Sequence, residues 1–118
     1  MLRWSFGLLV LCITCSATLA QTAKGIRFWN LTANTVKELY LSPAGKEEWG
    51  PDQCKNDKDG EVDHRERLKI SGIGAGRYDA RLVDNKGRNC IVRNIEIKDD
   101  AVFAIEEKQL KNCGKAKR

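Results

Sequence analysis

The stretch that decides the fold is residues 76–98, GRYDARLVDNKGRNCIVRNIEIK. Over 77–83 apolar residues alternate with charged ones, which is typical of a strand with one buried face. The DNKG sequence at 84–87 favours a tight turn, and a return strand over 89–98 completes a β-hairpin. The alternation slips near residues 93–94, which predicts a β-bulge there.

Further short apolar runs lie on both sides of this hairpin. They predict strands over 25–31, 36–41, 66–71 and 101–105, separated by turn signals, with a short helical turn over 106–110. No segment is long enough for the helical crossovers of a parallel α/β sheet. We therefore expect an all-β fold, a small antiparallel β-sandwich of about six to seven strands.

Residues 1–20 are predicted to be a signal peptide. Arg3 precedes an apolar run over 6–13, and small residues follow up to Ala20. We expect cleavage after Ala20, with Ala17 as the competing site. The run is shorter than the ~18–20 residues of a membrane span, so we expect no transmembrane segment after cleavage. The predicted product is one domain, residues 21–118, in the periplasm or outside the cell.

The charge of this domain is modest. Without Arg3 the chain keeps 20 basic and 16 acidic residues, which are interspersed except in the basic tail at 111–118. Such an end is predicted to be a solvated terminus, with weak attraction to an acidic surface as the alternative. No basic patch is interleaved with aromatic residues, so we expect no nucleic-acid partner.

Three cysteines follow the signal peptide: Cys54, Cys90 and Cys113. In an exported protein they favour a disulfide over a metal site. Residues 21–118 contain no CxxC spacing, and His64, the only histidine, cannot complete a zinc site alone. The third thiol could be buried, capped or used to join two chains. We expect no cofactor.

Several sequence blocks together resemble a group of small exported bacterial proteins of unknown function. The blocks are Asn30-Leu31-Thr32, LYLSPAG at 39–45 with Trp49-Gly50, GRYDARLVD at 76–84 with Gly87 and Cys90, and LKNC at 110–113. The resemblance spans most of residues 21–118. It implies a β-sandwich-like domain and a Cys90–Cys113 pair, and it implies no activity.

The expected strand order is compatible with that pair. If strand 101–105 pairs antiparallel with residues 91–98, the tight turn at 99–100 brings their far ends together. Cys90 and Cys113 then lie near each other, and Cys54 is the unpaired thiol.

Residues 45–65 form a long connection that contains a calcium-loop-like sequence. With Gly60 as the sixth residue of such a loop, the ligand positions fall on Asp57, Asp59, Asp63 and Glu66. Lys55, however, occupies the first position, where a carboxylate is required, and no helices flank the loop. We therefore expect a solvated loop with calcium affinity no better than roughly millimolar.

Trp49, with Glu47 and Glu48 beside it, is the predicted binding element. Tryptophan is favoured at binding hot spots because it offers a large area and one donor. The alternative is that Trp49 folds back on the sandwich and orders the long loop.

No catalytic arrangement is predicted. His64 stands beside Arg65 in a charged loop and is expected to be solvated, and Ser42 and Ser71 have no base at a recognisable spacing. We therefore expect a non-catalytic binding module for a protein or a cell-envelope component. The alternatives are a small exported hydrolase inhibitor, with Trp49 entering the cleft, and a weak divalent-cation-binding protein using the loop at 57–66. The oligomeric state stays open.

Overall fold

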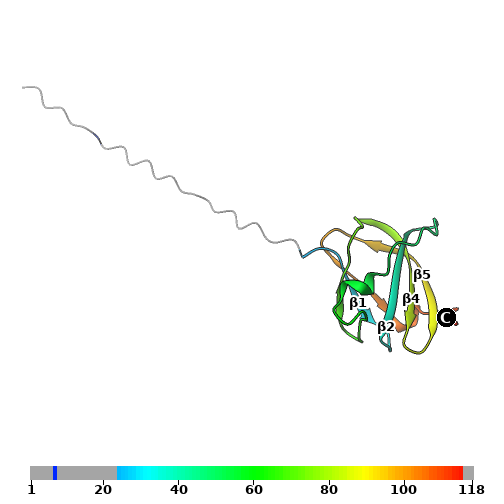
Figure 1. Ribbon diagram of the computed structural model, residues 1–118. Helices are drawn as coiled ribbons and strands as arrows, with labels where there is room; N and C mark the ends of the chain where they lie inside the picture. Colours follow the sequence, from blue (N-terminus) through cyan, green and yellow to red (C-terminus); the bar gives the residue numbers. More distant parts are fainter. Residues whose placement is uncertain (1–6, 8–23, 116–118) are drawn as a thin grey trace, which may run out of the picture.

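The computed structural model describes Gly7 and residues 24–115 (Figure 1). Apart from Gly7, the predicted signal peptide lies outside the described residues, as do residues 116–118 of the basic tail. The elements are β1 (Arg27–Leu31), β2 (Val36–Pro43), η1 (Gln53–Asn56), β3 (Arg67–Lys69), β4 (Gly76–Asp84), β5 (Arg88–Ile97), β6 (Val102–Glu106), η2 (Glu107–Gln109) and β7 (Gly114–Lys115). Among the described residues, no helix has the length and apolar character that a membrane crossing requires.

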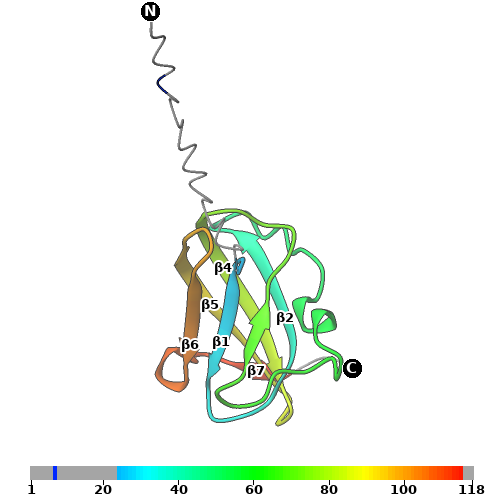
Figure 2. The same cartoon turned by 90° about the vertical axis from the view of Figure 1, so that its left-hand side faces the viewer.

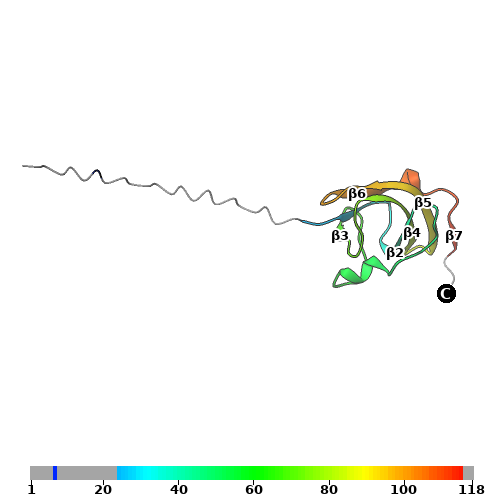
Figure 3. The ribbon, with the colours of Figure 1, turned by 90° about the horizontal axis from the view of Figure 1, so that it is seen from above.

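The strands form two sheets that face each other (Figures 2 and 3). One sheet has the order β3-β1-β6, and the other has the order β2-β4-β5-β7. The all-β sandwich is confirmed, as is the β4–β5 hairpin. The predicted bulge is confirmed as well, because the pairing of these two strands shifts between Tyr78 and Ala80, and Asn94 on β5 has a φ of 58°.

The predicted partner of β6 was wrong. β6 does not pair with residues 91–98; it runs parallel to β1 in the opposite sheet, with Phe103 beside Phe28. The cause lies in the preceding turn. The Asp100 carboxylate accepts the N–H of Gly25 at 2.6 Å, and the N–H of Arg27 donates to the Ala101 carbonyl at 3.0 Å. These bonds fasten the turn to the start of β1, so the chain changes sheets there.

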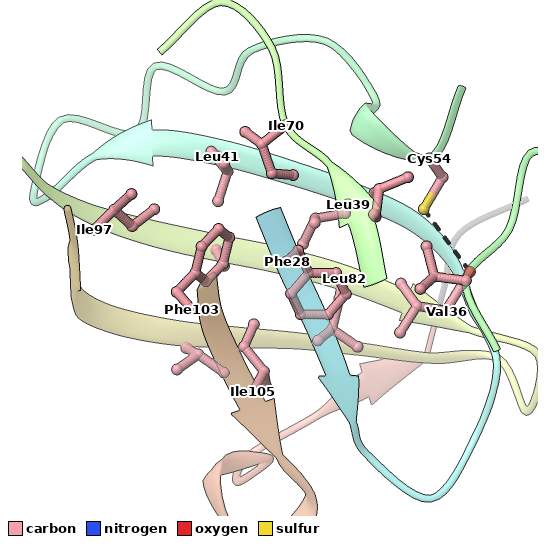
Figure 4. Close-up of a cluster of buried hydrophobic side chains, with 14 of the residues drawn as sticks. Phe28, Val36, Leu39, Leu41, Cys54, Ile70, Leu82, Ile97, Phe103 and Ile105 are labelled. Carbon is pink, nitrogen blue, oxygen red and sulfur yellow. Dashed lines mark hydrogen bonds between the residues drawn. The ribbon is translucent and has the colours of Figure 1, made fainter. Parts of the chain in front are cut away.

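Apolar side chains from both sheets fill the space between them (Figure 4). The largest fully buried ones are Phe28, Leu39, Leu82, Ile97 and Ile105. The rings of Phe28 and Phe103 lie 5.6 Å apart across the parallel pair. Burial of this cluster is the main force that holds the two sheets together.

The disulfide between Cys90 and Cys113 is confirmed. It ties the segment after η2 to β5, where Gly114 pairs with Asn89 to form the short strand β7. The pair was therefore predicted correctly, although the strand order used to support it was not. A covalent bond of this kind is typical of proteins in oxidising compartments.

The long connection at 45–65 lies along β2 and is anchored in the core. Val62 and Cys54 are fully buried, and Val62 exchanges two backbone hydrogen bonds with Val36, at 2.9 and 2.8 Å. The Cys54 thiol is unpaired and lies 3.8 Å from the Val36 carbonyl oxygen (Figure 4). Burial, with the Asp52 carboxylate nearby, raises the pKa of Cys54 to about 12, so this thiol stays protonated at neutral pH.

Candidate functional site

A row of side chains crosses the outer face of the four-stranded sheet. The strand register places Tyr40 beside Arg81 and Arg81 beside Ile91. The guanidinium carbon of Arg81 lies 4.6 Å from the centre of the Tyr40 ring and 5.7 Å from that of Trp49. We call Tyr40, Trp49 and Arg81 the stacked face.

The segment around Trp49 is hydrogen-bonded to the sheet beneath it. Three backbone N–H groups donate to sheet residues: Gly45 to the Asp79 carboxylate at 3.0 Å, Glu48 to the Ser42 hydroxyl at 2.8 Å and Gly50 to the Leu41 carbonyl at 2.9 Å. Trp49 is consequently half-buried over the outer face. Trp49 therefore packs on the sandwich, and its ring forms part of the stacked face.

Asp79 anchors the same region electrostatically. Its carboxylate is buried and accepts the N–H of Gly45, the N–H of Asn94 and the guanidinium of Arg93. Burial alone would raise the pKa of Asp79, but these three donors outweigh it and hold the pKa below its usual value. The other Arg93 nitrogen lies 3.6 Å from the Glu47 carboxylate.

Beside the stacked face lies a hollow of about 490 Å³ between β4, β5 and the segment after η2. Its polar lining consists of Arg81, Asn89, Arg93, Lys111 and Asn112, and we call it the basic hollow. A second hollow, of about 620 Å³, shares Arg93, Lys111 and Asn112 with it and extends the basic surface toward Lys108.

Two residues of the lining each have a buried polar atom without a hydrogen-bond partner. The atoms are Nε of Arg81 and Oδ1 of Asn89, two of the three such buried side-chain atoms among the described residues. No ion pair involves Arg81 within residues 24–115, although both Arg93 and the nearby Arg88 have carboxylate partners. The hollow thus holds two cations, Arg81 and Lys111, that the described part of the fold does not neutralise.

The predicted calcium ligands are not gathered into a site. Within residues 24–115, no group of three or more histidine, cysteine or acidic side chains could hold a metal ion. Asp63 instead accepts the Thr35 hydroxyl at 3.0 Å, and Glu66 accepts the Asp63 N–H at 3.0 Å. That backbone donor lowers the pKa of Glu66, but burial and the adjacent Asp57 carboxylate outweigh it, so the pKa is raised. Asp59 is exposed.

The three predicted binding residues are divided between two surfaces. Trp49 and Glu47 lie on the face that carries Arg81 and Arg93. Glu48 lines a separate hollow of about 400 Å³, next to Leu41, Ile73 and Tyr78. The hydrolase-inhibitor alternative, in which this loop would enter a cleft, stays a prediction.

The candidate acid–base residues have structural partners. His64 is exposed, and its Nδ1 lies 2.6 Å from the Thr32 carbonyl oxygen. The Ser42 hydroxyl donates to the Pro43 carbonyl and accepts the Glu48 N–H. Among the described residues, no hydrogen bond joins His64 to a serine or cysteine.

The residues of the basic hollow were not predicted as a site from the sequence. Arg81 was assigned only to the solvent side of its strand, and Lys111 and Asn112 only to the C-terminal tail. Their proximity results from the disulfide and from β7, which return the tail to β5. The one available signal was the combination of the predicted Cys90–Cys113 pair with the outward position of Arg81.

Comparison of the chain with protein-family models, with curated proteins and with solved structures finds no match. The resemblance to small exported proteins therefore stays a prediction, and the site is interpreted from its own residues.

Proposed function

We propose that this protein is an exported, non-catalytic binding module that attaches to a component of the cell envelope through the stacked face and the basic hollow. The observation that carries the proposal is Arg81. Its guanidinium is held against Tyr40 and Trp49, at 4.6 and 5.7 Å, without an ion-pair partner among the described residues.

Such an arrangement suits ligand binding better than stability. Stacking on aromatic rings restrains a guanidinium while its in-plane donors stay free for an anion. A side chain that is already ordered loses little conformational entropy when a ligand arrives. An unpaired cation kept in place by two aromatic residues is therefore a preorganised binding group.

Export is supported by the predicted signal peptide and by the cysteines. The disulfide Cys90–Cys113 suits the periplasm or the cell exterior, where thiols are oxidised. The one remaining described thiol, Cys54, is buried and protonated, so it does not compete for pairing. A binding role fits better than catalysis, because the basic hollow brings together cations and amides with no nucleophile or general base.

The test is co-sedimentation of the purified protein with washed envelopes of the producing cell. Arg81→Gln should lower the bound fraction at least about ten-fold, since a hydrogen bond to a charged group is among the stronger polar contacts. Arg77→Gln is the matched control. It removes the same charge from the same strand, at an exposed residue. Among the described residues, the one ion pair of Arg77 is with Glu96, with a nitrogen–oxygen distance of 3.9 Å. Melting temperatures of both variants report whether the fold is intact.

Two outcomes contradict the proposal. One is wild-type protein that stays in the supernatant at every salt concentration. The other is an equal loss of binding for Arg77→Gln and Arg81→Gln, which would indicate attraction to net charge alone.

A further inference from the structure

The outer edge of β6 is open along the three-stranded sheet. β6 lies at one edge of this sheet, beside β1, and none of the described strands pairs with its other side (Figure 2). The opposite edge, β3, is closed by η1, because the Asn56 amide donates to the Lys69 carbonyl at 2.8 Å. The edge strand β2 of the other sheet is covered by the connection at 45–65. β6 is thus an edge strand without such a cover.

The backbone groups of Val102 and Ala104 point away from β1. The N–H of Arg27 donates to the carbonyl of the residue before Val102 at 3.0 Å, which fixes the alternation of the parallel pair. Phe103 and Ile105 therefore hydrogen-bond to β1. Among the described residues, no hydrogen bond reaches the N–H or the carbonyl of Val102 or Ala104. Two donors and two acceptors are left in line along this edge.

The side chains of β6 do not protect the edge either. Its sequence, VFAIE, contains no lysine, proline or glycine, and its pairing with β1 has no bulge. These are the features by which natural sheets discourage the addition of a strand. Val102 is 37% exposed and is the one exposed large hydrophobic side chain among the described residues. An added strand would cover it and would also satisfy the free backbone groups.

The open edge is short. The next residue in the alternation, Glu106, donates its N–H to Oε1 of Gln109 at 2.8 Å, so the edge is closed there. A partner can therefore pair with Val102 and Ala104 without breaking any hydrogen bond of the described fold.

Charge at the two ends of β6 indicates which strand fits. Asp99 and Asp100, just before β6, are exposed and have no ion-pair partner among the described residues, whereas Glu106 is paired with Lys108 at 3.1 Å. A second copy of β6, added antiparallel with its Val102 opposite Ala104, would place Asp100 opposite Glu106. Like charges in opposite positions disfavour pairing, whereas lysine or arginine in these positions would favour it.

We propose that the outer edge of β6 binds an extended segment of a partner protein, in which alternating apolar residues are flanked by lysine or arginine. The segment adds to the three-stranded sheet by main-chain hydrogen bonds, as in other cases of strand addition. This surface lies on the sheet opposite the stacked face and the basic hollow, so the inference goes beyond the proposed function.

The test is an amide NMR titration and hydrogen exchange of the protein with the end-blocked peptide KTVTVTK. We expect saturable shifts and slower exchange at the amides of Val102 and Ala104. The amides of Phe103 and Ile105 already donate to β1 and should be protected with or without the peptide. The peptide ETVTVTE has the same apolar residues and opposite charges, and it should bind about three-fold more weakly or worse.

Variants of the edge locate the binding. Ala104→Pro removes one outward N–H and should abolish the saturable shift, since proline is tolerated on an edge strand where its missing N–H faces solvent. Val102→Lys should weaken binding of KTVTVTK several-fold, and it keeps the test valid should the proline variant unfold. Asp99→Asn should reduce the preference for KTVTVTK. Asp59→Asn removes the same charge from an exposed residue of the 45–65 connection and should bind as the wild type does.

Three results overturn the inference. They are the absence of a saturable shift with KTVTVTK, equal binding of ETVTVTE, and a dimer of the free protein in which the Val102 and Ala104 amides are already protected. The last would show that a second copy occupies the edge. None of them affects the proposed function, which depends on whether envelope binding requires Arg81.

Discussion

The Asp52 carboxylate accepts the backbone N–H of Leu39 at 3.0 Å, and the same oxygen accepts the N–H of Cys54 at 3.0 Å. Leu39 lies in the middle of β2, which forms one edge of the four-stranded sheet. Edge strands present unpaired backbone groups that can pair with another chain. The Asp52 side chain therefore covers part of this edge and also caps the N-terminus of η1.

Asp52→Ala should lower the free energy of unfolding by about 2 kcal/mol, or roughly 8–16 °C in melting temperature, because two charge-assisted hydrogen bonds are lost. It should also promote association through the uncovered edge, visible by light scattering after gel filtration. Asp52→Asn is the control, because its amide oxygen still accepts a hydrogen bond and about half of the loss should be recovered. Equal losses for both variants would show that the charge matters and the acceptor does not.

The sequence was sufficient to predict the elements whose signals are local. The hairpin of β4 and β5, its bulge and the β2 strand follow from alternation and turn residues near each of them. The turn after β1 is organised by a single side chain, that of Asn30. The Asn30 amide donates to the Asn34 and Val62 carbonyls while its oxygen accepts the N–H and hydroxyl of Thr32, so the side chain organises a turn.

What the sequence could not supply was the pairing between distant segments. Periodicity shows that Phe103 and Ile105 share a buried face, but not which sheet β6 joins. The answer depends on the Asp100–Gly25 hydrogen bond, which spans 75 residues. The basic hollow was inaccessible for the same reason, because Lys111 reaches Arg81 only through the return of the C-terminal segment to β5.

The disulfide gives the next prediction. Cys90 and Cys113 are separated by 23 residues, and closing a loop of this size should contribute around 3 kcal/mol in the chain-entropy model. The double variant Cys90→Ala/Cys113→Ala should therefore melt roughly 10–20 °C lower. Peptide mapping under non-reducing conditions checks the pairing. A Cys54 peptide linked to either partner as the main species would contradict it.

The ion cluster around Arg88 predicts acid lability. The Arg88 guanidinium lies 2.7 Å from a carboxylate oxygen of Asp84, through Nε, and 2.7 Å from one of Glu107, through Nη1. Burial opposes ionisation of Asp84, but Arg88 and nearby N–H groups hold its pKa below the usual value, and Arg88 also lowers the pKa of Glu107. A carboxyl group whose pKa is lowered in the folded state stabilises the fold at pH values above its unfolded pKa. This stability is lost as the pH falls through the folded pKa.

The melting temperature should therefore change little between about pH 7 and 5 and fall below about pH 4.5, where unfolded Asp and Glu begin to bind protons. Arg88→Gln should melt lower at pH 7 and show a shallower acid dependence, as measured by calorimetry at several pH values. Arg77→Gln, which affects only the exposed pair with Glu96, should keep the wild-type profile. Parallel profiles for the wild type and Arg88→Gln would contradict the assignment.

The last prediction concerns Glu66 and the neighbouring Asp57, two of the residues considered above as calcium ligands. The raised pKa of Glu66 reverses the usual sign for an acid, because the protonated form is the one that the fold favours. The stability that protonated Glu66 contributes is present below the unfolded Glu pKa of about 4.3. It is lost as the pH rises through the folded pKa.

Asp57→Asn removes the negative charge that lies next to Glu66. It also supplies an N–H₂ group at the position of Asp57 Oδ2, an atom that has no hydrogen-bond partner among the described residues. It should therefore raise the melting temperature at pH 7 by a few degrees and have little effect near pH 3, where Glu66 is protonated and no longer repels a neighbouring charge. Asp59→Asn removes the same charge from an exposed neighbour and should have little effect at either pH. A stabilisation of equal size at both pH values would show that Asp57 acts through hydrogen bonding rather than through repulsion of Glu66.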